Sequence, residues 1–474
     1  THKDLADEEC AGTFTAREGS MNIIGEFFES LKGKGSNESA SSDNRFTIEI
    51  FAAVVKKDWI DDSLRDCGRQ TKRERKLTAS FVMWLSIALG FYRTLSIKNV
   101  VHRVGTVFGI RSLWEDAQEP TSGSVVEART RIGFGPLRAL LGRVQQWLLA
   151  QYGDAMKWKT WRVMALDGTT TKVPDSNENR RRFGLPGSNR GQRAAFPQMR
   201  ALLLVSVHLR LILGAWFAPY RRGELTLALR ALDELPEKTL LLMDRLYVAW
   251  GWLWSLTSRG HQFVVRVSKH IRPRHVKRLG PGDHLVEITP SSYVRRRFPQ
   301  IPAKLHLREL SVRIRGKWYR FFTSLLDPGQ YPAVELVQLY CLRWQEEIGL
   351  DEIKTHQCAA TTVNRPLIFR SKSSRRVLQE AYALVIAYNI IRTIMMQAAN
   401  KSGIDPLRIS FVDSLERLRE AALLMAAAET TSLPRIFQDL LVSIARCILP
   451  KRRRSNPREV CIKMSAYPKK WKAA

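Results

Sequence analysis

The sequence of 474 residues lacks the patterns that mark many metal-thiolate and nucleotide-driven proteins. Its six cysteines are scattered, at Cys10, Cys67, Cys341, Cys358, Cys447 and Cys461. No two of them have the spacing of a zinc knuckle, and the nine histidines form no HExxH pattern, so we do not expect zinc. A glycine-rich phosphate loop of the Walker type is also absent, which argues against an ATP-driven machine.

Long uninterrupted hydrophobic runs are missing as well. The best stretch of bilayer length, residues 201–220, is broken by His208 and Arg210, which disfavours a membrane span. No signal peptide is recognisable, and cysteines without a dense framework are typical of free thiols in a reducing compartment. We therefore expect a cytoplasmic protein that has no membrane partner.

Acidic residues are far outnumbered by basic ones. Counting 76 Lys and Arg against 45 Asp and Glu gives a net charge of +31 at pH 7. Residues 1–45 are acidic, whereas residues 271–320 alone hold 13 basic and three acidic side chains. This excess predicts a polyanionic partner, although a basic stretch taken alone also fits a solvated face, a membrane surface or RNA.

The most informative segment is YCLRWQEEIGLDEIK, residues 340–354. It sets Glu347 among four other side chains at offsets of −7, −4, +4 and +7, which are Tyr340, Arg343, Asp351 and Lys354. On an α-helix that advances about 100° per residue, all five lie within an arc of roughly 80°. One helical face would carry a metal-type ligand flanked by phosphate-type ligands, although an amphipathic helix with i, i+4 ion pairs shows the same spacing.

Two strand-like segments upstream each lead into an aspartate. Residues 161–166 form an apolar run into Asp167, and residues 239–243 form another into Asp244. The aspartates are 77 residues apart and Glu347 follows after 103 more, an interval long enough to contain an insertion. Each aspartate alone also has a local explanation, the first as part of a turn dipeptide with glycine and the second as the partner of the next arginine.

The spacing Tyr-x2-Arg-x3-Glu-x6-Lys, with Trp344 directly after the arginine, resembles the signature of DDE transposases of the insertion-sequence-four family. Between the aspartates, residues 177–216 have the layout of that family: a Gly/Pro-rich loop, a Pro-Gln-x-Arg step and a hairpin of apolar strands. The resemblance runs from about residue 55 to the C-terminus. One departure is Leu246, which stands where the family usually has glycine.

The resemblance implies two sets of site residues. The catalytic set, Asp167, Asp244 and Glu347, would hold two Mg²⁺ ions, for which Mn²⁺ would substitute, because such hard cations prefer oxygen ligands. The DNA-binding set would comprise Tyr340, Arg343, Lys354, Trp344 and Trp318. The two tryptophans would stack on an extruded base, although tryptophans are more often core residues.

We expect an α/β protein with a ribonuclease H-like catalytic core and a β-rich insertion, flanked by an α-helical N-terminal domain and an α-helical C-terminal region. Core strands are predicted near residues 161–166, 200–206, 210–217, 239–243 and 262–267, with helices after the third and fourth. The predicted units are a flexible acidic segment (1–45), a helical DNA-end-binding domain (46–155), the catalytic domain (156–370, insertion at about 268–330) and a helical oligomerisation region with a basic tail (371–474).

Several helices are predicted individually. Ser124 and Glu127 form a capping box that opens a helix, and the following GFGP sequence separates it from a second one. This pair would either read DNA ends or simply pack together. A late helix over residues 333–356 is predicted to lay Glu347 across the two aspartates. Three apolar-periodic helices follow, at about 373–401, 405–428 and 434–448, and make either an oligomer contact or a monomeric cap.

These features predict a cut-and-paste DNA transposase. By resemblance, it would cleave the ends of a mobile element and join them to target DNA, with a hairpin as the intermediate. It would act on double-stranded DNA as a homodimer, bind the terminal inverted repeats, and associate with a bacterial nucleoid. Two other classes remain open: a domesticated, non-catalytic DNA-binding protein, and a ribonuclease H-like repair nuclease.

Overall fold

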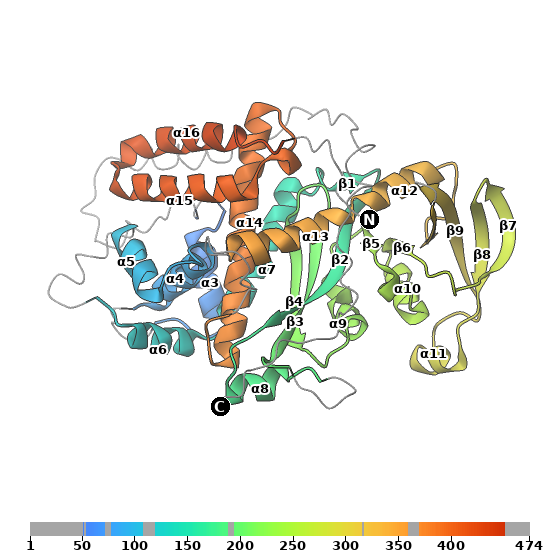
Figure 1. The fold of residues 1–474 in the computed structure, drawn as a ribbon, viewed down its shortest axis with the longest axis horizontal. Helices are drawn as coiled ribbons and strands as arrows, with labels where there is room; N and C mark the ends of the chain where they lie inside the picture. Colours follow the sequence, from blue (N-terminus) through green and yellow to red (C-terminus); the bar gives the residue numbers. More distant parts are fainter. Residues whose placement is uncertain are drawn as a thin grey trace, which may run out of the picture.

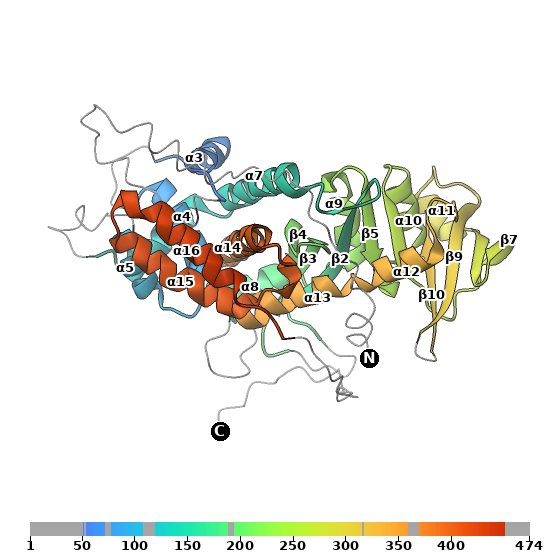
Figure 2. The same ribbon diagram turned by 90° about the horizontal axis from the view of Figure 1, so that it is seen from above.

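The computed structural model describes residues 51, 54–71, 77–107, 119–187, 194–314, 317–358 and 369–450. A long mixed sheet extends from a cluster of helices at one end of the molecule (Figure 1). The view from above in Figure 2 shows that the sheet and the helical cluster form one elongated body. The predicted acidic segment 1–45 and the basic tail after residue 450 lie outside the described residues.

Five strands form the central part of the sheet, in the order β4-β3-β2-β5-β6. They are β2 (Trp161–Lys172), β3 (Gln198–Ser206), β4 (Ile212–Pro219), β5 (Thr239–Met243) and β6 (Gln262–Arg266). β3 is antiparallel to β2 and β4, whereas β2, β5 and β6 run parallel. Helices α9 (Glu224–Ala231) and α10 (Trp250–Thr257) follow β4 and β5, so the predicted ribonuclease H-like order is confirmed. A short strand, β1 (Lys157–Trp158), pairs with the start of β2.

The insertion extends this sheet and does not form a separate layer. Its strands are β7 (Arg274–Gly280), β8 (Asp283–Ile288), β9 (Leu305–Ile314) and β10 (Lys317–Thr323), and the short helix α11 (Ser292–Arg297) lies between β8 and β9. β10 pairs antiparallel with β6, and β9, β8 and β7 continue outward from it. All four strands lie within the residues, about 268–330, where a β-rich insertion is expected. The outer strand β7 was not predicted, because five successive residues of it are exposed and it carries no buried alternation.

Alternation of side chains along the central strands creates two apolar layers. On β2, Met164 and Leu166 belong to the larger core, whereas Val163 and Ala165 belong to a second core on the opposite face. β5 alternates in the same way. Helix α12 (Ala333–Cys341) covers the second core with Leu336. The face of β2 that carries its odd-numbered residues is therefore the face under α12.

The described part of the N-terminal region is helical, as predicted. It contains α3 (Lys57–Asp66), α4 (Ala79–Phe91), α5 (Ile97–Val107), α6 (Ser122–Ile132) and α7 (Gly135–Tyr152). The predicted capping box at Ser124 was wrong by one turn: Thr121 is the N-cap of α6, and its hydroxyl accepts from the Ser124 N–H at 3.1 Å. Gly133 then ends the helix at φ 69°, in agreement with the predicted break.

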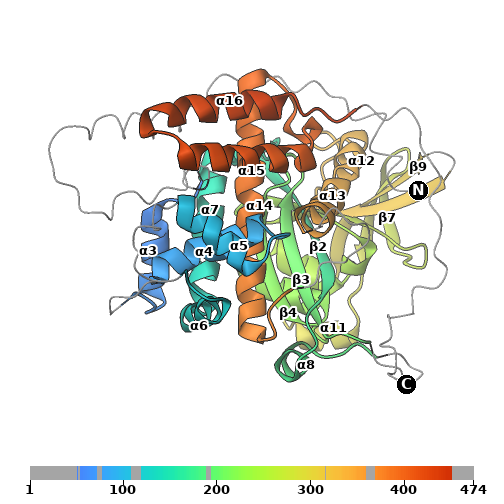
Figure 3. The ribbon, with the colours of Figure 1, turned by 60° about the vertical axis from the view of Figure 1, so that its left-hand side comes forward.

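Helix α14 (Ser374–Ser402) stands between the N-terminal helices and the sheet (Figure 3). It is the one described helix long and apolar enough to cross a membrane by length and composition, and 94% of its apolar window is buried inside the protein. Charges on it are paired: Glu380 contacts Arg93 at 3.0 Å and also lies beside Arg129. The helix thereby joins the N-terminal region to the sheet. Helices α15 (Phe411–Ala427) and α16 (Leu433–Ala445) complete the predicted C-terminal set.

The predicted single helix over residues 333–356 is divided into three parts. α12 ends at Cys341, α13 (Trp344–Asp351) begins after a turn at Leu342 and Arg343, and residues Glu352–Gln357 form a π-helix, η6. The turn and the π-helix each alter the direction of the side chains that follow, relative to an ideal α-helix. The expected single ideal helix was therefore wrong, and the positions of its side chains must be taken from the structure.

Candidate active site

The two predicted aspartates lie on neighbouring parallel strands. Asp167 lies inside β2 and not after it, because the pairing of β2 with β3 continues beyond this residue. The parallel pairing of β2 with β5 ends with Ala165 opposite Leu242, and Asp167 and Asp244 each stand two residues beyond that pair. Since adjacent strands are about 4.8 Å apart, the register sets the two aspartates side by side. Both continue the alternation of Ala165 and Leu242, so both face the side that α12 covers.

Burial and neighbouring carboxylates shape the chemistry of Asp167. Its Oδ1 accepts from the Gly168 N–H at 2.8 Å. Burial raises the pKa of Asp167 to about 6. The charges of Glu224 and Asp244 act in the same direction, whereas the Gly168 N–H and the Arg343 guanidinium oppose them. A carboxyl group in these surroundings is stabilised as the anion by any cation placed beside it.

Gly168 is required by the close approach of Glu224 and not by a turn. A Cβ atom at position 168 would lie 2.3 Å from Cδ of Glu224, which is far inside van der Waals contact. Glu224 is the first residue of α9, and its carboxylate also forms an ion pair with Arg200 of β3. The Asp-Gly dipeptide therefore marks a contact between β2 and α9, and the turn interpretation does not hold.

Glu347, the third predicted carboxylate, lies on α13 and is held by Arg343. The Nη2 atom of Arg343 donates to Oε1 of Glu347 at 2.6 Å, and its Nη1 atom lies 4.0 Å from Oδ2 of Asp167. Burial disfavours the charge on Arg343, but Tyr340, Glu347 and Asp167 outweigh this effect and raise the pKa of the guanidinium above its ordinary value. One arginine thus bridges two of the three carboxylates that the sequence predicted.

Glu346, the residue before it, is the most deeply buried carboxylate near Asp167 and was not predicted. Its side chain has no exposure, and neither carboxylate oxygen has a hydrogen-bond partner among the described residues. Burial raises the pKa of Glu346 well above its ordinary value, and Asp167 is the charge that acts on it most strongly. The sequence signal was only the Glu-Glu dipeptide.

Lys354 reaches the same face from the π-helix η6. Its ammonium donates to the hydroxyl of Thr169, which is the next residue after Asp167 on this face of β2. Burial lowers the pKa of Lys354, while the negative charges of Glu346 and Asp167 act in the opposite direction. We call the sheet face that carries Asp167, Thr169 and Asp244 the α13 face, because α13 packs against β2 there.

A buried charge cluster fixes η6 below this face. Glu352, its first residue, accepts from Arg210 Nη1 at 2.7 Å and from the Tyr388 hydroxyl at 2.8 Å. Arg392 of α14 lies 3.8 Å from the same carboxylate. Because all these side chains are buried, mutual attraction and packing hold them in one geometry. Lys354 therefore extends from a rigid support.

Tyr340 stabilises the end of β5. Its hydroxyl donates to the Met243 carbonyl at 3.2 Å, immediately before Asp244, and its ring lies 4.7 Å from the ring of Phe321. Burial raises the pKa of Tyr340 to about 12, so the phenol stays protonated and able to donate. In this structure the hydroxyl contacts protein backbone close to the second aspartate.

The segment after Asp244 accommodates the departure at Leu246. Asp244 accepts from the Arg245 N–H and caps the short 3-10 helix Arg245–Tyr247. Leu246 does not adopt the left-handed conformation, and its side chain is 53% exposed, so this segment does not require glycine. The following Tyr247 is completely buried and lies among the charges of Asp167, Glu224 and Glu346.

Three residues singled out from the sequence do not join the α13 face. Asp351 is 60% exposed and accepts from the Thr355 hydroxyl at 2.6 Å. Trp344 is buried, so the expectation that it stacks on an extruded base does not fit its position, and it serves as a core residue. Trp318 lies on β10 of the insertion and is 69% exposed, which leaves its ring accessible.

The α13 face offers oxygen donors of the kind that hard divalent cations prefer. Within the described ranges, no three His, Cys, Asp or Glu side chains form a ready-made cage around one point. Magnesium usually takes only one or two protein carboxylates and keeps water or substrate phosphate as its other ligands, so a ready-made cage is not required. The unpartnered carboxylate of Glu346 beside Asp167 fits a cation at this place.

The insertion carries a surface of exposed cations and exposed aromatic rings. Its exposed cations include Arg274, Lys277 and Arg278 on β7 and Arg295, Arg296 and Arg297 on α11. Exposed aromatic side chains, Trp318 and Tyr293, lie in the same insertion. Cations that reach phosphates, together with rings that stack on bases, are typical of nucleic-acid surfaces.

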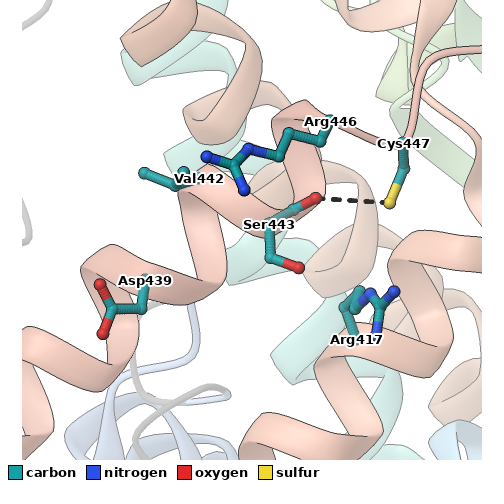
Figure 4. A pocket seen from close by; sticks show the side chains of 6 residues that line it. All are labelled: Arg417, Asp439, Val442, Ser443, Arg446 and Cys447. Carbon is teal, nitrogen blue, oxygen red and sulfur yellow. Dashed lines mark hydrogen bonds between the residues drawn. The ribbon is translucent and has the colours of Figure 1, made fainter.

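A separate hollow of about 490 Å³ lies on the C-terminal helices (Figure 4). It is lined by Arg417, Asp439, Val442, Ser443, Arg446 and Cys447. The Cys447 thiol donates to the Ser443 carbonyl at 3.4 Å, and Arg417 is paired with Glu420 at 3.0 Å. None of these residues belongs to the α13 face, so the hollow adds nothing to that site.

Comparisons with known proteins agree with the fold. The family model described as "Insertion element 4 transposase N-terminal" matches residues 45–142, and the model described as "Transposase DDE domain" matches residues 158–390. The chain is 28% identical over 414 residues to the transposase InsG for insertion sequence element IS4 of Escherichia coli (strain K12), covering 86% of this chain and 91% of that protein. It is 26% identical over 218 residues to the putative transposase InsZ of the same organism, covering 45% of this chain and 69% of that protein.

A solved structure is also similar to this chain over most of its length. It is the piggyBac transposase in a synaptic complex with hairpin DNA, with a TM-score of 0.40, 11% identity and 86% coverage of each chain. The two family models follow one another along the chain, the first on the N-terminal helices and the second on the sheet and α14. From the family models and the InsG match, the chain belongs to the insertion element 4 family of DDE transposases, which are DNA-cutting and DNA-joining enzymes.

Proposed function

We propose that this transposase cleaves the ends of its mobile element and joins them to target DNA through a hairpin intermediate. Asp167, Asp244 and Glu347 are proposed as the ligands of two Mg²⁺ ions, for which Mn²⁺ substitutes. The observation that carries this proposal is the pair of aspartates on neighbouring strands, both facing the helix that carries Glu347. The bound cations would activate the attacking oxygen and stabilise the leaving one at a single phosphodiester.

The protein side chains prepare this place for a phosphodiester. Arg343 holds Glu347 at 2.6 Å and stands 4.0 Å from Asp167, so it keeps the two carboxylates oriented before substrate arrives. Tyr340 anchors the backbone before Asp244 through its bond to Met243. Partial burial excludes water and strengthens electrostatic interactions on the α13 face.

A second group of residues is proposed to hold DNA. Arg343 offers a planar, bidentate fork to a phosphate, and Lys354 offers a compact positive charge near Asp167. Tyr340 is proposed to contact the backbone when its hydroxyl exchanges the Met243 carbonyl for a phosphate oxygen. The exposed ring of Trp318 is proposed to stack on a base that leaves the helix during hairpin formation, an interaction worth about 1–3 kcal/mol per base.

The wider assembly is proposed from the same chain features. Double-stranded DNA, both terminal inverted repeats and target, is the proposed partner, and the net charge of +31 supports a polyanion. Residues 46–155 are proposed to bind the element ends, residues 156–370 to catalyse, and residues 371–474 to form a homodimer. Exposed apolar side chains on α15, Val412, Leu423 and Leu424, support a protein contact there. Association with the nucleoid follows from the proposed DNA binding.

Arg343 provides the test of the hairpin step. A nuclease that only hydrolyses needs the carboxylates, whereas folding a strand back requires the backbone to be gripped as well. With end-labelled DNA that carries an element end, we expect Arg343→Ala to slow hairpin formation and opening at least about ten-fold more than the first nick. Denaturing gels separate these products over time.

A control variant and a contrary result complete the test of Arg343. Arg417→Ala removes an exposed arginine of α15 that is paired with Glu420 and is not among the residues of the α13 face, and it should leave every step unchanged. An equal loss at nicking, hairpin formation and hairpin opening in Arg343→Ala would make Arg343 only the structural partner of Glu347. The proposed hairpin grip would then be wrong.

A further inference from the structure

Two adjacent glutamates on α13 have opposite surroundings. Glu347 is 36% exposed at its side chain and is bonded to Arg343, so its charge is already paired. Glu346 has no exposure and no hydrogen-bond partner for either oxygen within the described residues. An unpartnered carboxylate of this kind is costly in a protein interior, so its retention calls for a compensating contact that the described residues do not supply.

The position of Glu346 indicates what that contact is. Glu346 is buried on α13, which packs against β2, and Asp167 of β2 is the charge that acts on it most strongly. Two acceptor groups that face each other cannot bond directly as anions, and they need a cation or a proton between them. Lys354 contributes positive charge nearby, but its ammonium is bonded to the hydroxyl of Thr169.

We propose that Glu346 is a fourth carboxylate of the site, which binds a divalent cation together with Asp167. The inference rests on the proposed function, because it assigns a further ligand to the same metal site. It gives the two glutamates different tasks: Glu346 approaches the cation from the buried side, and Glu347 approaches from the exposed side where DNA would enter.

Cation binding without DNA tests this directly. The full chain is titrated with Mn²⁺ by calorimetry, as wild type, Glu346→Gln, Asp167→Asn and the control Asp351→Asn, whose side chain is exposed on the same helix. We expect Glu346→Gln to weaken Mn²⁺ binding at least about ten-fold, the lower range for loss of a residue that supports a metal site. Asp351→Asn should bind like the wild type. In a chelator, Glu346→Gln should melt at the same temperature as the wild type or higher, because an unpartnered buried charge has been removed.

The contrary results separate this inference from the proposed function. If Asp167→Asn loses Mn²⁺ binding and Glu346→Gln binds like the wild type, the metal site stands and the role of Glu346 is overturned. If both variants bind like the wild type, the metal assignment falls together with this inference. Should Glu346→Gln fail to fold, Glu346→Met fills a similar volume without charge, and the same criteria apply to it.

Discussion

The charged side chains of the α13 face and those of the insertion differ in their exposure to solvent. On the α13 face, Glu346 is fully buried, and Arg343 and Lys354 are bonded to Glu347 and Thr169 of the same small cluster. On the insertion, the cations of β7 and α11 are exposed, and salt in solution can screen them. Buried charges interact strongly in a fixed geometry, whereas exposed charges attract a polyanion from many orientations. Under the proposed function, the first region would cleave the phosphodiester and the second would supply affinity for DNA.

The largest effect is expected from the carboxylates. Replacing Asp167, Asp244 or Glu347 singly by alanine should reduce cleavage of element ends at least about a thousand-fold, because residues that act as a unit in catalysis fail together. DNA affinity should change little, since the cations that supply it remain. Cleavage assays and fluorescence anisotropy on the same preparations measure both quantities. Asp351→Ala is the matched control, and robust cleavage by Asp244→Ala would remove that residue from the ligand set.

The support below the α13 face gives the next largest effect. Glu352→Ala leaves Arg210 and Arg392 buried without their carboxylate, and breaking such a buried pair costs about 3–5 kcal/mol of unfolding free energy. Urea denaturation measures the loss. Glu416→Ala removes an exposed carboxylate that is paired with Arg419 and should cost at most about 1 kcal/mol. Similar losses for the two variants would contradict the rigid support assigned to η6.

Substitutions in the insertion should change the salt dependence of DNA binding and leave the rate of cleavage unchanged. Replacing Arg295, Arg296 and Arg297 by alanine should lower the slope of log K against log salt by about 0.9 for each phosphate that these arginines neutralise. At saturating DNA, the rate of cleavage should stay within about two-fold of the wild type, because exposed cations that bind phosphates supply affinity and not chemistry. Arg435→Ala, an exposed arginine on α16, serves as the control. An unchanged salt slope in the triple variant would place the DNA surface elsewhere.

The smallest effect is a dependence of stability on pH. Asp167 has its pKa raised from 3.8 to about 6, so the folded protein binds this proton more tightly than the unfolded chain does. The stabilisation by this proton is present at low pH and is lost as the pH rises through about 6. In a chelator, Asp167→Asn should therefore gain melting temperature over the wild type at pH 7 and gain less at pH 5. An equal gain in melting temperature at pH 7 and at pH 5 would contradict the burial of Asp167.

The sequence predicted what depends on short-range pattern. The apolar runs before Asp167 and Asp244, and the spacing from Tyr340 to Lys354, led to the central strands and to the family. Alternation then placed both aspartates on one face, because side chains of a strand repeat every two residues.

What the sequence did not show depends on contacts between distant segments. The close approach of Glu224 to Gly168 is invisible along the chain, so the Asp-Gly pair resembled a turn. The turn at Leu342 and Arg343 and the π-helix after Asp351 depart from the helical period, so one ideal helix was the wrong description of residues 333–356. Glu346 differs from Glu347 only in which neighbour it faces, and no periodic pattern separates two adjacent carboxylates.

The most direct test of the central claim is to locate the cation. Crystals of the protein with DNA that carries an element end, soaked in Mn²⁺, would reveal the ion by its anomalous scattering. The account predicts a peak within coordination distance of both Asp167 and Asp244 on the α13 face. An active protein whose Mn²⁺ peaks lie away from these two carboxylates would contradict it.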